Sequence, residues 1–111
     1  MQKSSLSELT EHHLTTARGA SSGRSAQTLQ GGHDSVLRQT LIALAEGQRL
    51  DEHENPGEAT VHVLHGAVRL GSVTGDTCDG TAGDLLTVPD ARHSLHALKD
   101  AVVLLTVAKT R

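Results

Sequence analysis

The 111-residue sequence predicts an all-β fold, an antiparallel sandwich or barrel, preceded by one short helix. The apolar residues are almost all Val, Leu and Ala, and the chain contains no Phe, Trp or Tyr. A core without aromatic rings must be filled by aliphatic side chains, and the branched ones suit strands better than helices. From about Thr28 onward, short apolar runs alternate with turn residues, and no helical segment separates them. This pattern favours antiparallel pairing over βαβ units.

The first predicted element is a helix from Ser5 to Arg18. Ser5 and Glu8 have the spacing of a capping box. One side of the segment recurs with a helical period, at Leu6, Leu9, His13 and Ala17. A helix this short and weakly amphipathic needs a surface on which to lie. We expect the two adjacent histidines, His12 and His13, on its solvated side.

The stretch Gly19–Gln27 is rich in Gly and Ser and predicts a flexible linker. The chain is therefore divided into two parts. Residues 1–27 form the N-terminal helix and the linker, and residues 28–111 form the barrel.

Six apolar runs in the second part are predicted to be strands. They are Leu37–Ala45, Ala59–Leu64, Ala67–Val73, Leu85–Val88, His93–Ala97 and Ala101–Ala108. Gly66 lies between two of these runs and suits a tight hairpin or a bulge. Gly75 and Asp76 suit a second hairpin, with a two-residue turn in which the glycine comes first.

Composition and charge exclude several classes of function. A net charge of -3 offers no basic surface to phosphates or anionic lipid, and without aromatic rings bases cannot be stacked. We therefore expect neither nucleic acid nor a membrane as a partner. Cys78 is the only cysteine, so no internal disulfide and no Cys-based zinc ribbon can form. The first residues lack the apolar region of a signal peptide, and no apolar run is long enough to cross a bilayer, which predicts a cytoplasmic protein.

Two stretches of the barrel segment resemble the signature motifs of the cupin family. In the first, a glycine is followed by five residues and a histidine, and a second glycine closes the stretch: Gly47, His53 and Gly66. In the second, GDLLTVPDARHSL, a glycine is followed by five residues, a proline and a histidine: Gly83, Pro89 and His93. The resemblance extends from about Thr28 to the C-terminus. It implies a small single-domain cupin, a jelly-roll barrel of the double-stranded β-helix type.

The resemblance also implies a site at the barrel mouth that contains His53 and His93. In the family these positions ligate one divalent transition metal, of which Zn, Fe, Ni and Mn suit imidazole. Two further ligand positions depart from the pattern: Asn55 replaces a histidine, and Ala59 stands where a glutamate is expected, with Glu58 one residue out of phase.

The third ligand that a catalytic metal needs has two candidates. Glu58 reaches the site if the Asn55-Pro56-Gly57 turn bulges, although strand alternation places it on the other face. Asn55 is the second candidate, through its amide oxygen. Alternatively, His53 and His93 line a pocket without metal.

Two other polar residues are candidates for ligand binding. Gln39 shares a strand face with Leu37 and Leu41, so it is expected to project into the barrel and to hydrogen-bond a ligand or a histidine. Arg92, beside His93, suits a bidentate contact with a carboxylate, or else faces solvent. The remaining histidines of the strands are expected outside the barrel: His62, His65 and His96.

Two functions from different classes follow. The first is a small-molecule binding protein with an aliphatic barrel. The second is a metal-dependent cupin enzyme, similar to a small dioxygenase. Because open barrels leave edge strands, we also expect a homodimer.

Overall fold

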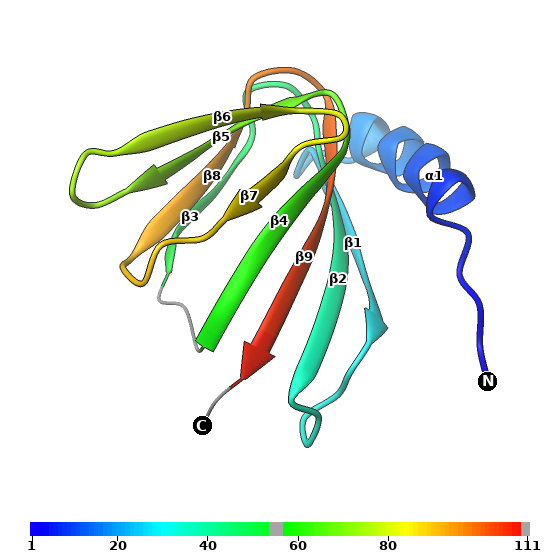
Figure 1. Cartoon of the computed structure of the whole chain (residues 1–111). Coiled ribbons are helices and arrows are strands. Elements are labelled where there is room, and N and C mark those ends of the chain that lie inside the picture. Colours follow the sequence, from blue (N-terminus) through cyan, green and yellow to red (C-terminus); the bar gives the residue numbers. More distant parts are fainter. Residues whose placement is uncertain (54–56, 110–111) are drawn as a thin grey trace.

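The computed structural model describes residues 1–53 and 57–109, and the side chains of residues 52 and 53 lie outside that description. Helix α1 (Leu6–Gly19) precedes nine strands within these residues (Figure 1). The strands are β1 (Arg24–Gln30), β2 (Leu37–Leu44), β3 (Arg49–His53), β4 (Gly57–His65), β5 (Ala67–Ser72), β6 (Thr77–Thr81), β7 (Leu85–Thr87), β8 (His93–Ala97) and β9 (Ala101–Lys109). The helix is not long and apolar enough to span a membrane. The predicted all-β fold with one N-terminal helix is confirmed.

The strands form two antiparallel sheets that face each other (Figure 1). One sheet has the order β1-β2-β9-β4-β7, and the other has the order β3-β8-β5-β6. The main core lies between them and consists of alternate residues of each strand, such as Val61 and Val63 of β4 or Val68 and Leu70 of β5. Burial of these aliphatic side chains contributes about 1.5–3 kcal/mol each to folding. Core filling by branched aliphatic residues is thus confirmed.

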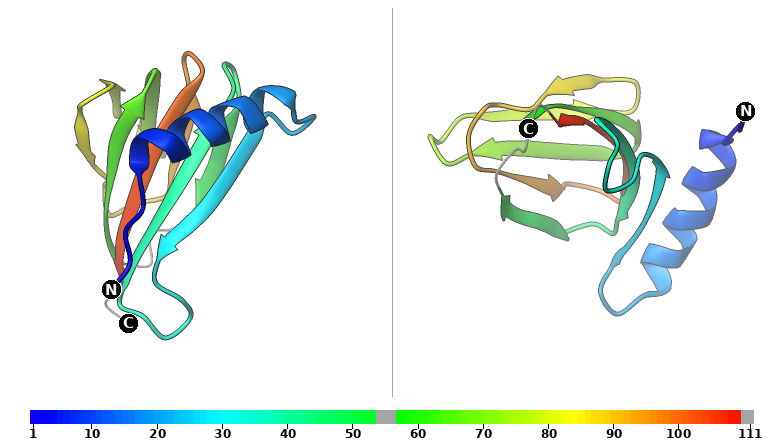
Figure 2. Two further views of the ribbon diagram at one scale, coloured as in Figure 1. Left: turned by 90° about the vertical axis from the view of Figure 1, so that its right-hand side faces the viewer. Right: turned by 90° about the horizontal axis from the view of Figure 1, so that it is seen from below.

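Helix α1 lies outside the barrel, on the outer face of the five-stranded sheet (Figure 2). Its N-cap is Ser5, whose side chain accepts a hydrogen bond from the Glu8 backbone N–H at 3.3 Å, as the capping-box spacing predicts. A second apolar cluster fills the helix–sheet interface: Leu14, Ala17, Leu41, Ala43 and Val102. The surface that the short helix needs is therefore provided by β2 and β9.

The prediction of a solvated His13 is wrong. His12 is exposed, but His13 is only 6% exposed and lies between the helix and β1. Its Nδ1 lies 2.7 Å from the Ser25 hydroxyl, and its Nε2 lies 2.8 Å from Oε1 of Gln27. Two polar partners on the strand satisfy the ring, which removes the penalty of burying it.

The prediction of a flexible linker at Gly19–Gln27 is also wrong at both of its ends, since Gly19 belongs to α1 and residues 24–27 belong to β1. Arg24–Gln30 is strand β1, which pairs with β2 in antiparallel register from Arg24↔Leu44 onward. The boundary at residue 27 consequently falls within a strand. Strand pairing uses backbone N–H and C=O groups, which every residue of this segment has. The Ser- and Gln-rich composition therefore did not indicate that the segment pairs with β2.

All six predicted strands are present: the bounds of His93–Ala97 agree at both ends, and no end of the others is displaced by more than two residues. Like β1, strands β3 and β6 were not predicted, because RLDEH and TCDGT contain no apolar run. The hairpin at Gly75 joins β5 and β6, but four residues, 73–76, lie between the two strands. The prediction of a two-residue turn is therefore wrong.

Gly66 does not close a hairpin. β4 belongs to the five-stranded sheet and β5 to the four-stranded one, so the chain crosses between sheets at this glycine. Its φ of +78° and its position against the Asp100 carbonyl oxygen leave no space for a side chain. The irregularity in this region lies just before it, between Val63 and His65 in the pairing of β4 with β9.

Candidate functional site

His93 begins strand β8 and faces the interior of the barrel. It alternates with the buried residues Leu95 and Ala97 and is itself 5% exposed. In the sheet it is paired with His53 on β3 and with Ser72 on β5. The start of β8 lies at the same end of the barrel as the start of β4 and the end of β9 (Figure 1). We call this end the mouth.

The imidazole of His93 is oriented by the backbone. Its Nδ1 lies 3.0 Å from the carbonyl oxygen of Ala91, and a carbonyl only accepts, so Nδ1 carries the proton. In the neutral ring, Nε2 then has the lone pair. A histidine that ligates a metal typically has this second bond from its other ring nitrogen to a carbonyl.

The described side chains do not, however, assemble a metal centre. Among them, no group of three or more His, Cys, Asp or Glu residues lies close enough to hold an ion. Two residues implied by the resemblance fall outside this test, since Asn55 and the side chain of His53 lie outside the described part of the structure. The described residues thus supply one suitable imidazole, and no reaction step through a metal follows from them.

Glu58, the carboxylate candidate, lies on the wrong face of its strand. Ala59 and Val61 of β4 are buried in the core, whereas Glu58 is exposed and pairs with Ala108 of β9. Because successive residues of a strand point to opposite faces, Glu58 points out of the barrel. The alternative in which a bulge brings Glu58 into the barrel-mouth site is therefore wrong, and a role of Glu58 in ligand binding stays a prediction.

Gln39 also faces outward. It shares its face of β2 with Leu41 and Ala43, which pack beneath the helix, while Ile42 and Leu44 face the barrel core. The Gln39 Nε2 donates to the hydroxyl of Thr106 on β9 at 3.2 Å. The predicted contact with a ligand in the barrel is wrong, because the apolar residues beside Gln39 belong to the helix interface.

Arg92 precedes β8 and is exposed, as the solvent-facing alternative predicts. Its backbone carbonyl accepts a hydrogen bond from the Val73 N–H at 3.1 Å. The three strand histidines predicted outside the barrel are outside it. His65 is exposed, and His62 and His96 are half-buried on faces opposite to the core residues of their strands.

A pocket of about 310 Å³ opens near the start of β8, although His93 itself does not line it. One wall is the β5–β6 hairpin, with Leu70, Ser72, Thr74, Asp76, Thr77 and Cys78. The other wall is the end of β7 and the segment after it, with Thr87, Pro89, Asp90 and Ala91. The hydrogen bond between Val73 and Arg92 joins the two walls, and Ala91 links the pocket to the His93 ring.

The sequence does not predict this pocket, because no pattern assigns any of its lining residues to ligand binding. Ser, Thr and Asp near glycines are typical of turns, and the two walls come from separate segments, residues 70–78 and 87–91. The available signal was the second motif itself, because Pro89 and Ala91 lie within it.

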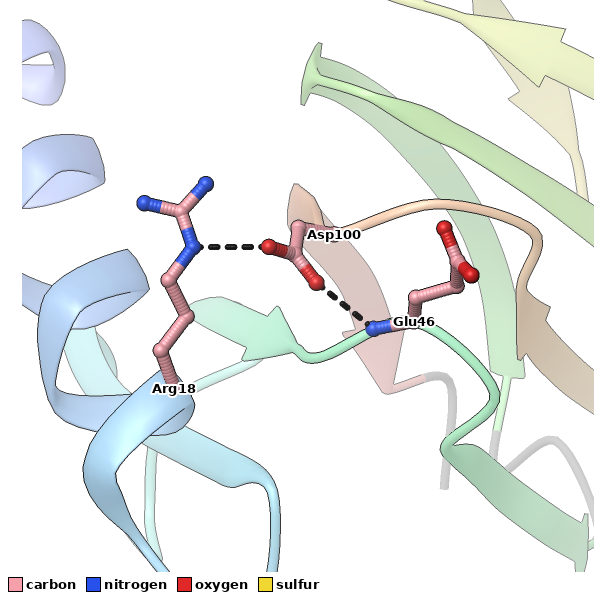
Figure 3. A network of polar contacts seen from close by, with 3 residues as sticks. All are labelled: Arg18, Glu46 and Asp100. Atoms are coloured by element: carbon pink, nitrogen blue, oxygen red, sulfur yellow. Dashed lines mark hydrogen bonds and ion pairs between the residues drawn. The ribbon is translucent and has the colours of Figure 1, made fainter.

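The side chains whose pKa values are shifted do not line the pocket. Hydrogen bonding between Arg69 and Asp79, on the outer face of the four-stranded sheet, lowers the pKa of Asp79 and raises the pKa of Arg69. A hydrogen bond from Arg18, and then one from the Glu46 backbone N–H, lowers the pKa of Asp100 (Figure 3). These groups stabilise turns and strands rather than form an acid–base pair at the mouth.

Solved structures share this architecture. A conserved protein of unknown function from Streptococcus pyogenes is 26% identical over 83% of this chain and 79% of that chain, with a TM-score of 0.73. A cupin superfamily protein from Desulfitobacterium hafniense DCB-2 is 19% identical over 77% of this chain and 76% of that chain, with a TM-score of 0.69. An RmlC-like cupin from Desulfovibrio desulfuricans is 21% identical over 78% of this chain and 82% of that chain, with a TM-score of 0.67.

No family model and no curated protein matches the sequence. The match is therefore one of architecture, that of two facing antiparallel sheets. The chain folds as a small cupin domain.

Proposed function

We propose that this protein binds a small molecule in the pocket between the β5–β6 hairpin and the segment after β7. The single observation that carries the proposal is the pocket itself. Its volume of about 310 Å³ lies at the lower end of the range for small-molecule sites. Leu70 and Pro89 offer apolar surface, and hydroxyl and carboxylate groups offer specific polar contacts, which is the mixed lining that such sites have.

Small-molecule binding requires fewer specific residues than metal-dependent catalysis does. A metal-dependent enzyme needs a third ligand beside His53 and His93, and Glu58 points out of the barrel. A binding site needs only complementary surface. We further propose a cytoplasmic location, since an exposed free thiol at Cys78 is compatible with a reducing compartment.

The position of Cys78 makes the proposal directly testable. It is the only cysteine of the chain, it is exposed, and it lines the pocket. A molecule bound there shields the thiol, so a true ligand slows the reaction of Cys78 with an aromatic disulfide reagent in proportion to occupancy. A screen of metabolite-sized compounds by this rate is expected to yield ligands that protect the thiol saturably.

The matched control moves the thiol away from the pocket. In the double variant Cys78→Ser/Ser21→Cys the thiol lies on the exposed turn between α1 and β1, so the same compounds are expected to leave its reaction rate unchanged. Equal protection of both thiols, or saturable ligands whose NMR shifts avoid the β5–β6 hairpin, would contradict the proposal.

The metal-dependent enzyme is the second candidate, and one observation favours it: the Nδ1–H of His93 donates to the Ala91 carbonyl. Elemental analysis of untagged protein purified without added metal decides between the two. Near-stoichiometric Zn, Fe, Ni or Mn that is lost in His93→Ala supports the enzyme. Metal-free protein that takes up none of these ions on titration leaves binding as the function.

A further inference from the structure

The charges of the pocket point to the class of its ligand. Its lining includes two carboxylates, Asp76 from the hairpin wall and Asp90 from the opposite wall. No Lys, Arg or His side chain is among the lining residues that the structure describes. A cleft with negative charge on both walls attracts cations and repels anions.

Neither carboxylate is neutralised within the described part of the chain. The ion pairs found there join Arg18 to Asp100, Arg49 to Asp51 and Arg69 to Asp79. Asp76 accepts one weak hydrogen bond, from the Thr74 hydroxyl at 3.3 Å. Arg92 is the cation nearest to Asp90 in sequence, and it enters none of these ion pairs.

The remaining lining narrows the kind of cation. Quaternary ammonium groups are recognised by aromatic cages, and this chain contains no aromatic residue of the Phe, Trp or Tyr type. What the pocket offers are oxygen acceptors: the two carboxylates and the hydroxyls of Ser72, Thr77 and Thr87. These groups recognise N–H donors, which primary and secondary ammonium groups carry.

We infer that the pocket binds a small aliphatic primary or secondary amine. Its ammonium group lies against Asp76 and Asp90, and its hydrocarbon part lies on Leu70 and Pro89. This inference rests on the proposed binding function and adds the ligand class to it. A volume of about 310 Å³ restricts the ligand to a compact amine.

The test uses three molecules with the same four-carbon chain and different charge: 1,4-diaminobutane, 1,4-butanediol and succinate. Affinities are measured by protection of Cys78 and by amide shifts in NMR spectra. The diamine is expected to bind at least about tenfold more tightly than the diol or succinate, because charge-assisted hydrogen bonds are about twice as strong as neutral ones. Its affinity is also expected to fall with rising salt concentration.

Isosteric variants test whether the charges of Asp76 and Asp90 bind the amine. Asp76→Asn and Asp90→Asn each remove one charge and keep the shape, and each is expected to weaken diamine binding about tenfold or more. Asp34→Asn, in the exposed loop between β1 and β2, makes the same change in net charge and is expected to leave the affinity unchanged. Thermal unfolding of each variant verifies that the fold is retained.

The outcomes separate this inference from the function on which it rests. If succinate or the diol protects Cys78 as well as the diamine does, the pocket binds small molecules but the amine class is wrong. If the double variant Asp76→Asn/Asp90→Asn binds the diamine with full affinity, the amine class is likewise wrong. If none of the three binds while the wider screen yields protecting ligands, only the amine inference fails; if that screen also yields none, the binding function fails too.

Discussion

Two adjacent histidines show that a shift of one position along a helix decides whether a side chain is exposed or buried. His12 and His13 have the same chemistry and neighbouring numbers, yet one is exposed and the other is enclosed between α1 and β1. In the neutral ring, Nε2 of His13 donates to the Gln27 amide oxygen and Nδ1 accepts from the Ser25 hydroxyl. His13 is thus a polar contact by which the helix is held to the sheet.

His13→Ala is expected to lower the free energy of unfolding by about 1–3 kcal/mol, because Gln27 and Ser25 lose their partner in a half-buried place. Denaturant unfolding measures the loss. His12→Ala is the control and is expected to change stability by no more than about 0.5 kcal/mol. Equal effects of the two substitutions would show that the contact with β1 does not stabilise the helix.

At the scale of elements, hydrogen bonds between connecting segments hold the strands and the helix together. Asp100, in the turn between β8 and β9, accepts from Nε of Arg18 at 2.7 Å and from the Glu46 backbone N–H at 2.8 Å (Figure 3). It thereby joins the end of α1, the β2–β3 turn and the β8–β9 turn at the end of the barrel away from the mouth. The crossing at Gly66 packs against the carbonyl of the same residue.

The pKa of Asp100 is lowered on folding, so its charge stabilises the fold above the ordinary aspartate pKa and loses this effect as pH falls below about 4. We expect Asp100→Asn to be less stable than the native protein at pH 7, by no more than about 1 kcal/mol because the pair with Arg18 is partly exposed. The difference is expected to shrink when urea unfolding is repeated near pH 2.5. A difference independent of pH would mean that the carboxylate charge has no part in it.

Gly66→Ala is expected to destabilise the protein by at least about 3 kcal/mol, since a Cβ there meets the Asp100 backbone at a left-handed φ. Gly75→Ala provides the matched comparison. Gly75 has a φ of +96°, but an added Cβ would meet no atom within 4 Å, so only the backbone cost of about 1–2 kcal/mol is expected. Thermal unfolding of both variants checks the order, and equal losses would contradict the steric argument.

At the scale of the whole molecule, two sheets leave four strand edges and a partly uncovered outer face. β7 is a short edge strand, and its Leu85 is 65% exposed. Helix α1 covers the outer face of the same sheet only at its opposite edge, over β1, β2 and β9 (Figure 2). Edges and apolar side chains of this kind are commonly covered by association.

The homodimer predicted from the sequence is tested by light scattering coupled to gel filtration at micromolar concentration. We expect a mass twice that of the chain. Leu85→Lys, which adds a charge to the exposed edge, is expected to shift the equilibrium toward monomer. A monomeric mass for the native protein would contradict the prediction.

Much of the fold was predictable from local patterns. Alternation and turn residues identified six strands, the capping box located the helix start within one residue, and the second motif located His93 at a buried, inward position. The strands and the helix start depend on residues close together in the chain, through the two-residue period of strands, hydrogen bonding at a helix terminus and the spacing of turns. The position of His93 was implied by the resemblance of the second motif to that of cupins.

The rest was decided only when distant segments came together. The alternation of side chains along a strand predicts that Gln39 and Leu41 share a face. It does not predict whether this face lies under the helix or in the barrel. The pairing of β1 with β2 depends on backbone groups that carry no sequence signal. The pocket needs Asp76 and Asp90 on opposite walls, and no local pattern relates them.

The sequence by itself therefore determined the fold class and the helix, because short-range periodicity and steric rules set them, and the resemblance to the second cupin motif implied the position of His93 at the barrel mouth. Only the tertiary structure decided which side of each strand is the inside, why His13 is buried and where a ligand has room. Those properties belong to pairs of segments, and the free energy that selects them comes from burying one segment against another.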